Sequence, residues 1–244
     1  MMTKKKAEDL DALRDRIMLA VLDNVPFDGW TPKAVEHARD MLKLGQADIE
    51  AACPNGIPQL LDQMADWADR QALAHMETLD LDAMRVRDRI TVAVKARLEA
   101  LAPHKDAVRR SFALLPRPRY GGQVPQSVWR SADRFWIKAG DTAQDYNHYT
   151  KRGLLSGVII STTLFWLNDS SEDHEASWKF LDRRIDNVLT MGKALGRFKP
   201  VFETAEKAAS GPRKFARKLT SMAGKGSAAP ASDASTAPGS EAVH

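Results

Sequence analysis

The sequence predicts an all-α protein that buries one substantial core. Apolar residues recur at helical spacing along nearly the whole chain, and no alternation of apolar and polar residues lasts long enough to predict a β-strand. The chain has 244 residues, of which 43% are hydrophobic, and this is enough for a self-sufficient fold. The longest apolar stretch, residues 153–167, is interrupted by Ser and Thr and is shorter than the roughly 20 residues of a bilayer span. We therefore expect it to form a core helix.

The N-terminal part predicts three helices with a helix-turn-helix outline. The first is expected over residues 7–24 and should stop at Pro26, because proline has no amide hydrogen to donate. Thr31 is a suitable N-cap for a second helix over residues 32–44, and a short third helix follows over residues 46–52. This arrangement is the usual vehicle for reading a DNA major groove.

The middle of the chain predicts six longer helices separated by turn residues. They are expected over residues 58–78, 82–101, 104–115, 126–138, 144–168 and 172–196. Prolines and a Gly-Gly pair predict a loop over residues 116–125. Ser170 and Asp173 are expected to cap the last long helix, and Asp141 or Thr142 to cap the one before it.

The C-terminal segment carries the basic character of the protein. Residues 191–244 contain nine Lys/Arg and four Asp/Glu, a net charge of +5, whereas the first 190 residues carry −1, so the basic balance of the chain lies in this segment. Two short amphipathic helices are expected over residues 200–209 and 212–223, followed by a disordered tail. The second helix has an apolar stripe beside basic residues and is predicted to bind an anionic membrane surface. The membrane-binding residues are Arg213, Lys214, Phe215, Arg217, Lys218, Leu219 and Met222.

Sequence signatures of catalysis are absent. The chain has no Gly-x-Ser-x-Gly elbow and no phosphate-binding glycine loop, and it lacks the paired Glu-x-x-His motifs of a di-iron bundle. Its six histidines are scattered without ligand spacing, so we expect neither a metal nor a catalytic cofactor. Cys53 is the single cysteine, which indicates a reducing compartment, and we see no targeting segment before Glu8. The sequence predicts a non-enzymatic cytoplasmic protein.

The charge pattern argues against DNA binding. Proteins bind duplex DNA mainly by neutralising phosphates with Lys and Arg. The third helix has no basic residue and contains Asp48 and Glu50. A ligand-responsive transcriptional regulator of the TetR type therefore remains only the alternative function, supported by the helix-turn-helix outline.

Four motifs occur together along the chain and carry a resemblance. They are Phe27–Thr31, Trp136–Asp141, Asp145–Arg152, and the stretch from Asn168–Ser171 through Trp178–Ile185. In these motifs the chain resembles the TetR-like accessory lipid-binding proteins of ubiquinone (coenzyme Q) biosynthesis. The resemblance covers roughly residues 10–198.

The resemblance implies a TetR-like helical bundle that has lost DNA binding and holds a polyprenylated quinone intermediate. It also implies a homodimer, and a partner that is the di-iron hydroxylase acting on demethoxyubiquinone. The expected parts are a degenerate helix-turn-helix segment, a lipid-binding and dimerisation domain, a basic membrane-binding segment and a disordered tail, over residues 1–56, 57–198, 199–223 and 224–244. The protein should then act on the inner face of the membrane as a peripheral protein.

Three sets of residues follow as candidates. Apolar residues on neighbouring helices either line a lipid pocket or fill an ordinary core, namely Leu61, Met64, Ile90, Val94, Phe135, Leu154 and Val158. The resemblance implies an apolar surface patch for the hydroxylase at Phe135, His148, Tyr149 and Arg152, although a tryptophan can occupy the position of His148 in the family. Dimer contacts are expected at Trp166, Trp178 and Leu181.

Overall fold

The computed structural model describes residues 4–114, 117, 123–142 and 146–197. Within these ranges every regular element is a helix, which confirms the all-α class. The helices are α1 Lys4–Asp28, α2 Pro32–Leu42, α3 Gln46–Ala52, α4 Ile57–Glu77, α5 Val86–Leu101, α6 Lys105–Phe112, α7 Gln123–Lys138, α8 Tyr146–Asn168 and α9 Glu175–Arg197, with 3-10 turns at Ala102–His104 and Glu172–His174.

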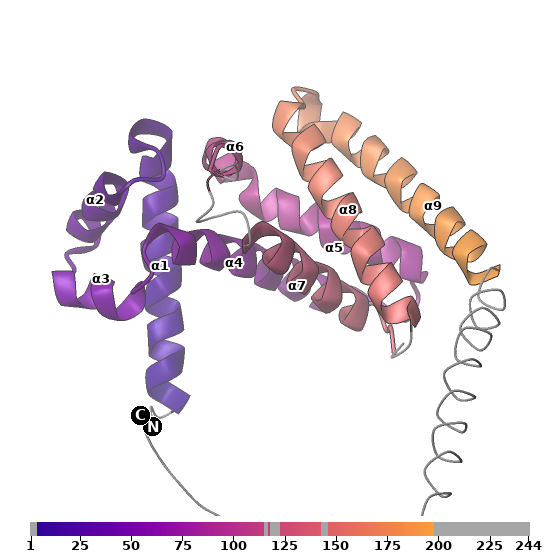
Figure 1. Cartoon of the computed structure of the whole chain (residues 1–244), viewed down its shortest axis with the longest axis horizontal. Coiled ribbons are helices and arrows are strands. Elements are labelled where there is room, and N and C mark those ends of the chain that lie inside the picture. Colours follow the sequence, from indigo (N-terminus) through magenta and orange to yellow (C-terminus); the bar gives the residue numbers. More distant parts are fainter. Residues whose placement is uncertain (1–3, 115–116, 118–122, 143–145, 198–244) are drawn as a thin grey trace, which may run out of the picture. The chain divides into compact units, whose positions relative to one another are not determined.

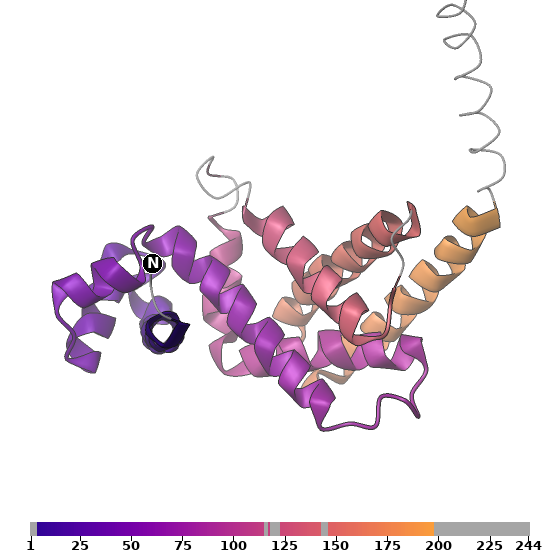
Figure 2. The same ribbon diagram turned by 90° about the horizontal axis from the view of Figure 1, so that it is seen from below.

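Helix α4 is shared by two buried clusters in the unit formed by residues 1–192. Its first half packs with α1, α2, α3 and α6 around Met18, Leu22 and Leu60, all of which are buried. Its second half packs with α5, α7, α8 and α9 around Phe135 and Leu155. In both views α1, α2 and α3 lie on the left, and α4 runs from them towards α7, α8 and α9 on the right (Figures 1 and 2).

The segment after α1 ties the first cluster to α6. Gly29 has a φ of +69°, a conformation that glycine adopts without steric cost. This turn buries Trp30, whose Nε1 donates a hydrogen bond to the backbone oxygen of Ala107 at 3.0 Å. Trp30, which belongs to the Phe27–Thr31 motif, therefore helps to anchor the three N-terminal helices to α6.

Two of the expected helix boundaries are wrong because proline is tolerated near helix ends. Helix α1 continues through Pro26 to Asp28, and the Gly29 amide still donates to Val25 at 2.8 Å. Pro26 lies in the last turn, so few later bonds depend on it. Helix α7 starts at Gln123 and holds Pro125 in its first turn, where an amide hydrogen has no helical partner. The predicted loop is correspondingly shorter on its C-terminal side.

The start of α9 is capped by residues other than those predicted. The Asp169 carboxylate accepts hydrogen bonds from the backbone amides of Ser171 and Ser177 at 2.8 Å, and the Ser171 hydroxyl accepts one from Ala176 at 3.0 Å. Burial acts to raise the pKa of Asp169, but the hydrogen bonds from Ser177 and Ser171 outweigh it and lower the pKa below its usual value. Asp169 and Ser171 therefore act as the caps.

Candidate functional site

A cavity of about 90 Å³ lies among α4, α5, α6, α7 and α8 in the described part of the chain. Aliphatic side chains form most of its wall, including Leu61, Met64, Leu101, Val108, Val128 and Ile159. A site of this composition favours an apolar ligand, since few polar groups need to be satisfied.

The cavity lining also contains polar side chains. One comes from each of the five helices, namely Asp62, Arg97, Ser111, Ser127 and Thr163. Arg97 is buried, and its Nε donates to Asp69 Oδ1 at 2.9 Å. Asp69 is fully buried and also accepts a hydrogen bond from the Ser131 hydroxyl at 2.8 Å. A buried charge is costly unless it is paired, so this ion pair sets a polar anchor beside an apolar space.

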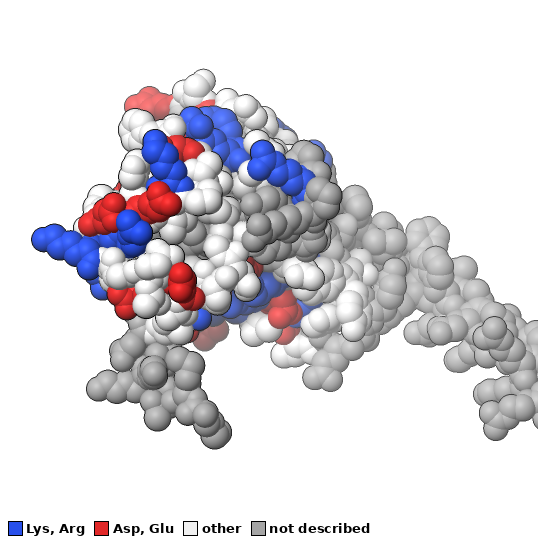
Figure 3. Space-filling view, turned by 60° about the vertical axis from the view of Figure 1, so that its left-hand side comes forward, with Lys and Arg blue, Asp and Glu red and all other residues white. Residues whose placement is uncertain are grey.

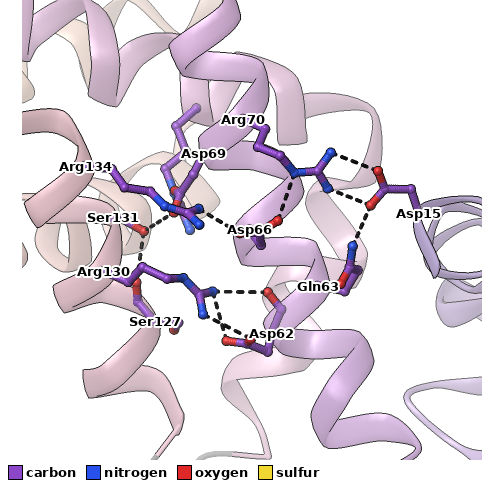
Figure 4. A network of polar contacts seen from close by, with 11 residues as sticks. Asp15, Asp62, Gln63, Asp66, Asp69, Arg70, Ser127, Arg130, Ser131 and Arg134 are labelled. Atoms are coloured by element: carbon purple, nitrogen blue, oxygen red, sulfur yellow. Dashed lines mark hydrogen bonds and ion pairs between the residues drawn. The ribbon is translucent and has the colours of Figure 1, made fainter. Parts of the chain in front are cut away.

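A ladder of ion pairs joins α7 to α4 beside the cavity, which Asp62 lines (Figure 4). Arg130 binds both oxygens of Asp62 at 2.9 and 3.0 Å, and Arg134 binds Asp66 at 2.7 Å. The arginines and the aspartates are each four residues apart, which places each pair on one helix face. These side chains are partly exposed. Helix α7, whose Ser127 and Val128 line the cavity, is therefore held to α4 partly by contacts that water can replace.

The ladder continues from α4 to α1. Arg70 binds Asp66 at 2.8 Å and reaches Asp15 of α1 at 2.7 Å (Figure 4). Burial acts to raise the pKa of Asp66, but Arg70 and Arg134 outweigh it, so the net pKa is lowered. Asp66 therefore stays ionised at neutral pH and links three helices.

The structure separates the candidate lipid-binding residues. Leu61 and Met64 line the central cavity. Ile90 and Val158 line a second cavity of about 20 Å³, beside Trp136 and Ile185. Phe135 and Val94 are buried core residues that line neither of these cavities, and half-buried Leu154 also lines neither.

The candidate partner residues divide into exposed and buried groups. Tyr149 is 65% exposed, and half-buried His148 packs edge-on against it with ring centroids 5.1 Å apart. Phe135 and Arg152 are buried in this chain, so they are not part of a surface patch. Sequence reasoning missed Trp129, whose ring lies 6.3 Å from that of Tyr149. The outward position of Trp129 on α7 was readable, because Val128, Ala132 and Phe135 form the buried face.

Arg152 positions the start of α8. Its Nε donates to Asp133 at 2.5 Å, and its Nη1 donates to Asp141 at 3.1 Å. Lys151 also binds Asp141 at 2.5 Å. Asp141, expected as a helix cap, thus holds two cations of α8. Arg152 does not touch a partner itself; it fixes the start of α8, the part of the helix that carries Tyr149.

The candidate dimer residues are also mostly internal. Trp166 and Leu181 are fully buried in one chain, and Trp178 is half-buried. Near the C-terminal end of α8 the exposed large apolar side chains are Leu164 and Phe165, and Phe165 stacks on Phe180 of α9 with 4.5 Å between ring centroids. Trp166 faces the core, whereas its neighbour Phe165 lies on the outer side of α8 and is the better candidate for a dimer contact.

The surface of α2 and α3 mixes charges of both signs (Figure 3). Lys33 pairs with Asp28 at 2.8 Å, and Arg39 pairs with Asp40 at 2.7 Å. Asp48 accepts a hydrogen bond from the Gly45 amide at 2.9 Å at the start of α3. The described part of this face has no continuous basic stripe, so it lacks the charge footprint of a DNA-binding helix.

The predicted membrane-binding segment and tail lie outside the described residues. Among the described helices, none is long and apolar enough to cross a membrane. The described ranges also contain no group of three or more His, Cys, Asp or Glu side chains arranged to hold a metal ion.

The arrangement of these helices defines a protein of the TetR-like class. A crystal structure of a TetR transcriptional regulator from Nitrosomonas europaea matches with a TM-score of 0.60 and 19% sequence identity, covering 73% of this chain and 98% of that one. This similarity shows the fold alone.

The sequence relatives define the family. A family model for COQ9 matches residues 122–192. Ubiquinone biosynthesis protein COQ9-B, mitochondrial, of Xenopus laevis is 30% identical over 230 residues, covering 89% of this chain and 75% of that protein. The COQ9 proteins of Bos taurus and Homo sapiens are 28% and 27% identical over 224 residues, covering 88% of this chain and 69% and 70% of theirs. The chain belongs to the COQ9 family and has a role in ubiquinone biosynthesis.

Proposed function

We propose that this chain is a non-enzymatic accessory protein that binds a polyprenylated quinone intermediate and presents it to the di-iron demethoxyubiquinone hydroxylase. The observation that carries the proposal is the cavity with an apolar wall and a buried arginine. An isoprenoid tail needs aliphatic contacts, and the ring of a quinone precursor carries oxygens that accept hydrogen bonds from a guanidinium. Leu61 and Met64 supply the aliphatic contacts for the tail, and the guanidinium of Arg97 supplies the hydrogen-bond donor for the ring oxygens.

Binding requires the cavity to widen. Its volume of about 90 Å³ is well below the roughly 300–1,000 Å³ of sites for drug-sized ligands. We place this widening at the start of α7, because its nearest ion pair with α4, between Arg130 and Asp62, is partly exposed. Exposed pairs of this kind contribute only about 0–1 kcal/mol each. The lipid therefore enters as α7 separates from α4.

Presentation to the hydroxylase uses the exposed aromatic patch, which we define as Trp129 and Tyr149. Aromatic side chains on a rigid helix are typical anchors of protein interfaces. Half-buried His148 supports the Tyr149 ring, and buried Arg152 fixes the start of α8. A homodimer forms through the face that contains Phe165 and Phe180. The basic segment at residues 212–223 brings the assembly to an anionic membrane as a peripheral protein.

The proposal is tested by mass spectrometry of lipid that co-purifies with the native protein. Ala65 lines the cavity from α4, and Ala65→Leu fills it with an isobutyl group. Ala74→Leu is the matched control, because Ala74 is exposed on the same helix. We expect an isoprenoid quinone species in the wild-type protein and the control, and several-fold less in Ala65→Leu. Phospholipid alone, or equal occupancy in both variants, would contradict the proposal.

A further inference from the structure

A cleft of about 470 Å³ lies between α2, α3 and the start of α4, and it shares no lining residue with the central cavity. Its volume falls in the range of small-molecule sites, roughly 300–1,000 Å³. Proteins pack their interiors closely, so a concave space of this size beside short helices is a candidate ligand site. The cleft lies in the helix-turn-helix part of the chain, and the proposed lipid function assigns no role to that part.

Part of the cleft lining is apolar, and it includes the planar indole ring of Trp30. Trp30 of the first recognised motif contributes to the wall, and its Nε1 bond to Ala107 fixes the ring. Val35, Ile49 and Ile57 add aliphatic surface from α2, α3 and α4. A planar apolar group is the natural occupant of such a surface, and inorganic ions and sugars are not.

At the rim of the cleft, the cation Arg39 is paired with a carboxylate that a ligand can replace. Arg39 lines the cleft, and its Nε and Nη2 bind the carboxylate of Asp40 at 2.9 and 2.7 Å. Its Nη1 donates to Gln46 Oε1 at 3.4 Å. The Arg39–Asp40 pair is exposed and therefore weak, so the planar guanidinium can exchange Asp40 for a ligand carboxylate.

The lining also limits the charge of the ligand. Besides Arg39, the charged residues of the lining are Arg117 and Glu36, so two cations face one anion, and this balance favours a singly charged anion over a polyanion such as a nucleotide.

We propose that this cleft binds a small aromatic carboxylate, with the ring on Trp30 and its aliphatic neighbours and the carboxylate on Arg39. The inference goes beyond the proposed lipid function and does not depend on it. The site would let a soluble small molecule act on the chain at a surface separate from the lipid cavity.

The test uses the full chain with 1-naphthoate as the probe and 1-naphthalenemethanol as its neutral counterpart. Methyl NMR reports on the cleft through Val35, Ile49 and Ile57, and on the central cavity through Val108 and Ile159. We expect saturable shifts at the first three methyl sites and weaker binding of the neutral compound.

Arg39→Gln should weaken naphthoate binding by about fivefold, as expected for one partly exposed ionic contact. Lys43→Gln is the matched control, because Lys43 is a cation just beyond the end of α2 that does not line the cleft. Shifts only at Val108 and Ile159, no shifts at millimolar probe, or equal affinity of Arg39→Gln and Lys43→Gln would each overturn the inference. Lipid co-purified with Arg39→Gln should remain at the wild-type amount, which separates this result from a failure of the lipid proposal.

Discussion

Removal of the buried carboxylate at Asp69 should be severely destabilising. Asp69 is fully buried and receives hydrogen bonds from Arg97 Nε at 2.9 Å and from the Ser131 hydroxyl at 2.8 Å. Asp69→Ala leaves the guanidinium of Arg97 inside the protein without its partner. The serine is affected less, because its hydroxyl can still donate to the Ser127 carbonyl at 3.0 Å.

The expected magnitude follows from the unpaired charge at Arg97. Loss of one partner of a buried ion pair costs about 3–5 kcal/mol, because the remaining charge is not solvated. For a chain of this length, each 1 kcal/mol lowers Tm by roughly 2–4 °C. Asp69→Ala should therefore lower Tm by about 6–20 °C. Replacement of both partners, in Asp69→Leu with Arg97→Met, should restore the free energy of unfolding to within about 1 kcal/mol of wild type.

Urea unfolding at pH 7, followed by circular dichroism, measures these differences. Glu99→Ala is the control, because Glu99 forms an exposed pair with Lys95 on the same helix as Arg97 and should change stability by less than about 0.5 kcal/mol. The double variant also tests function, because it should fold normally and yet hold less quinone precursor. A loss below 1 kcal/mol in Asp69→Ala, or a double variant no more stable than the single one, would refute the reasoning.

Four further perturbations test other parts of the molecule. Phe165→Asp should shift the protein from dimer to monomer in sedimentation equilibrium, because the charge meets its own copy across an isologous interface; an unchanged dimer would exclude this face. Asp169→Ala should cost about 1–2 kcal/mol in urea unfolding at pH 7. The pKa of Asp169 is lowered in the folded protein, so its carboxylate stabilises the fold fully above the unfolded pKa of about 3.9. This stabilisation is lost as the pH falls through the folded pKa, and Asp169→Ala, which has no carboxylate, should not show that loss of stability. Tyr149→Ser should weaken hydroxylase binding roughly tenfold in a titration without lowering Tm, and equal affinity would remove Tyr149 from the patch. Truncation after Ala209 should leave a folded protein that floats less with anionic vesicles at low salt, and equal flotation would exclude the basic segment as the membrane contact.

The sequence predicted the helical class and most helix positions, because a period of 3.6 residues is a local property. Helix α4 illustrates this: its buried face at Leu60, Met64 and Ala68 follows the period directly. Helix boundaries were less predictable. Whether Pro26 ends α1 depends on the turn that follows it, and that turn is fixed by burial of Trp30 against α6.

The faces of α8 could not be predicted from its sequence. This helix is apolar on several sides, so periodicity does not say which side meets the core. Trp166 and Phe165 are adjacent in the chain, yet the first is fully buried and the second is 37% exposed. Phe135 of α7 is a different case: it was expected both in the lipid lining and, from the resemblance, in the partner patch, and the structure buries it in the core.

By itself the sequence determined that the chain forms helices, that its basic charge gathers at the C-terminal end, and that it resembles the accessory proteins of ubiquinone biosynthesis. Only the tertiary structure decided which polar groups meet. Asp69 and Arg97 are 28 residues apart, and Asp62 and Arg130 are 68 residues apart. Charged residues are spread along α4, α5 and α7, and a carboxylate becomes the partner of a particular arginine only when two helices pack at one register. The buried ion pair beside the cavity therefore exists because α4 and α5 pack at that register, and no local pattern specifies that packing.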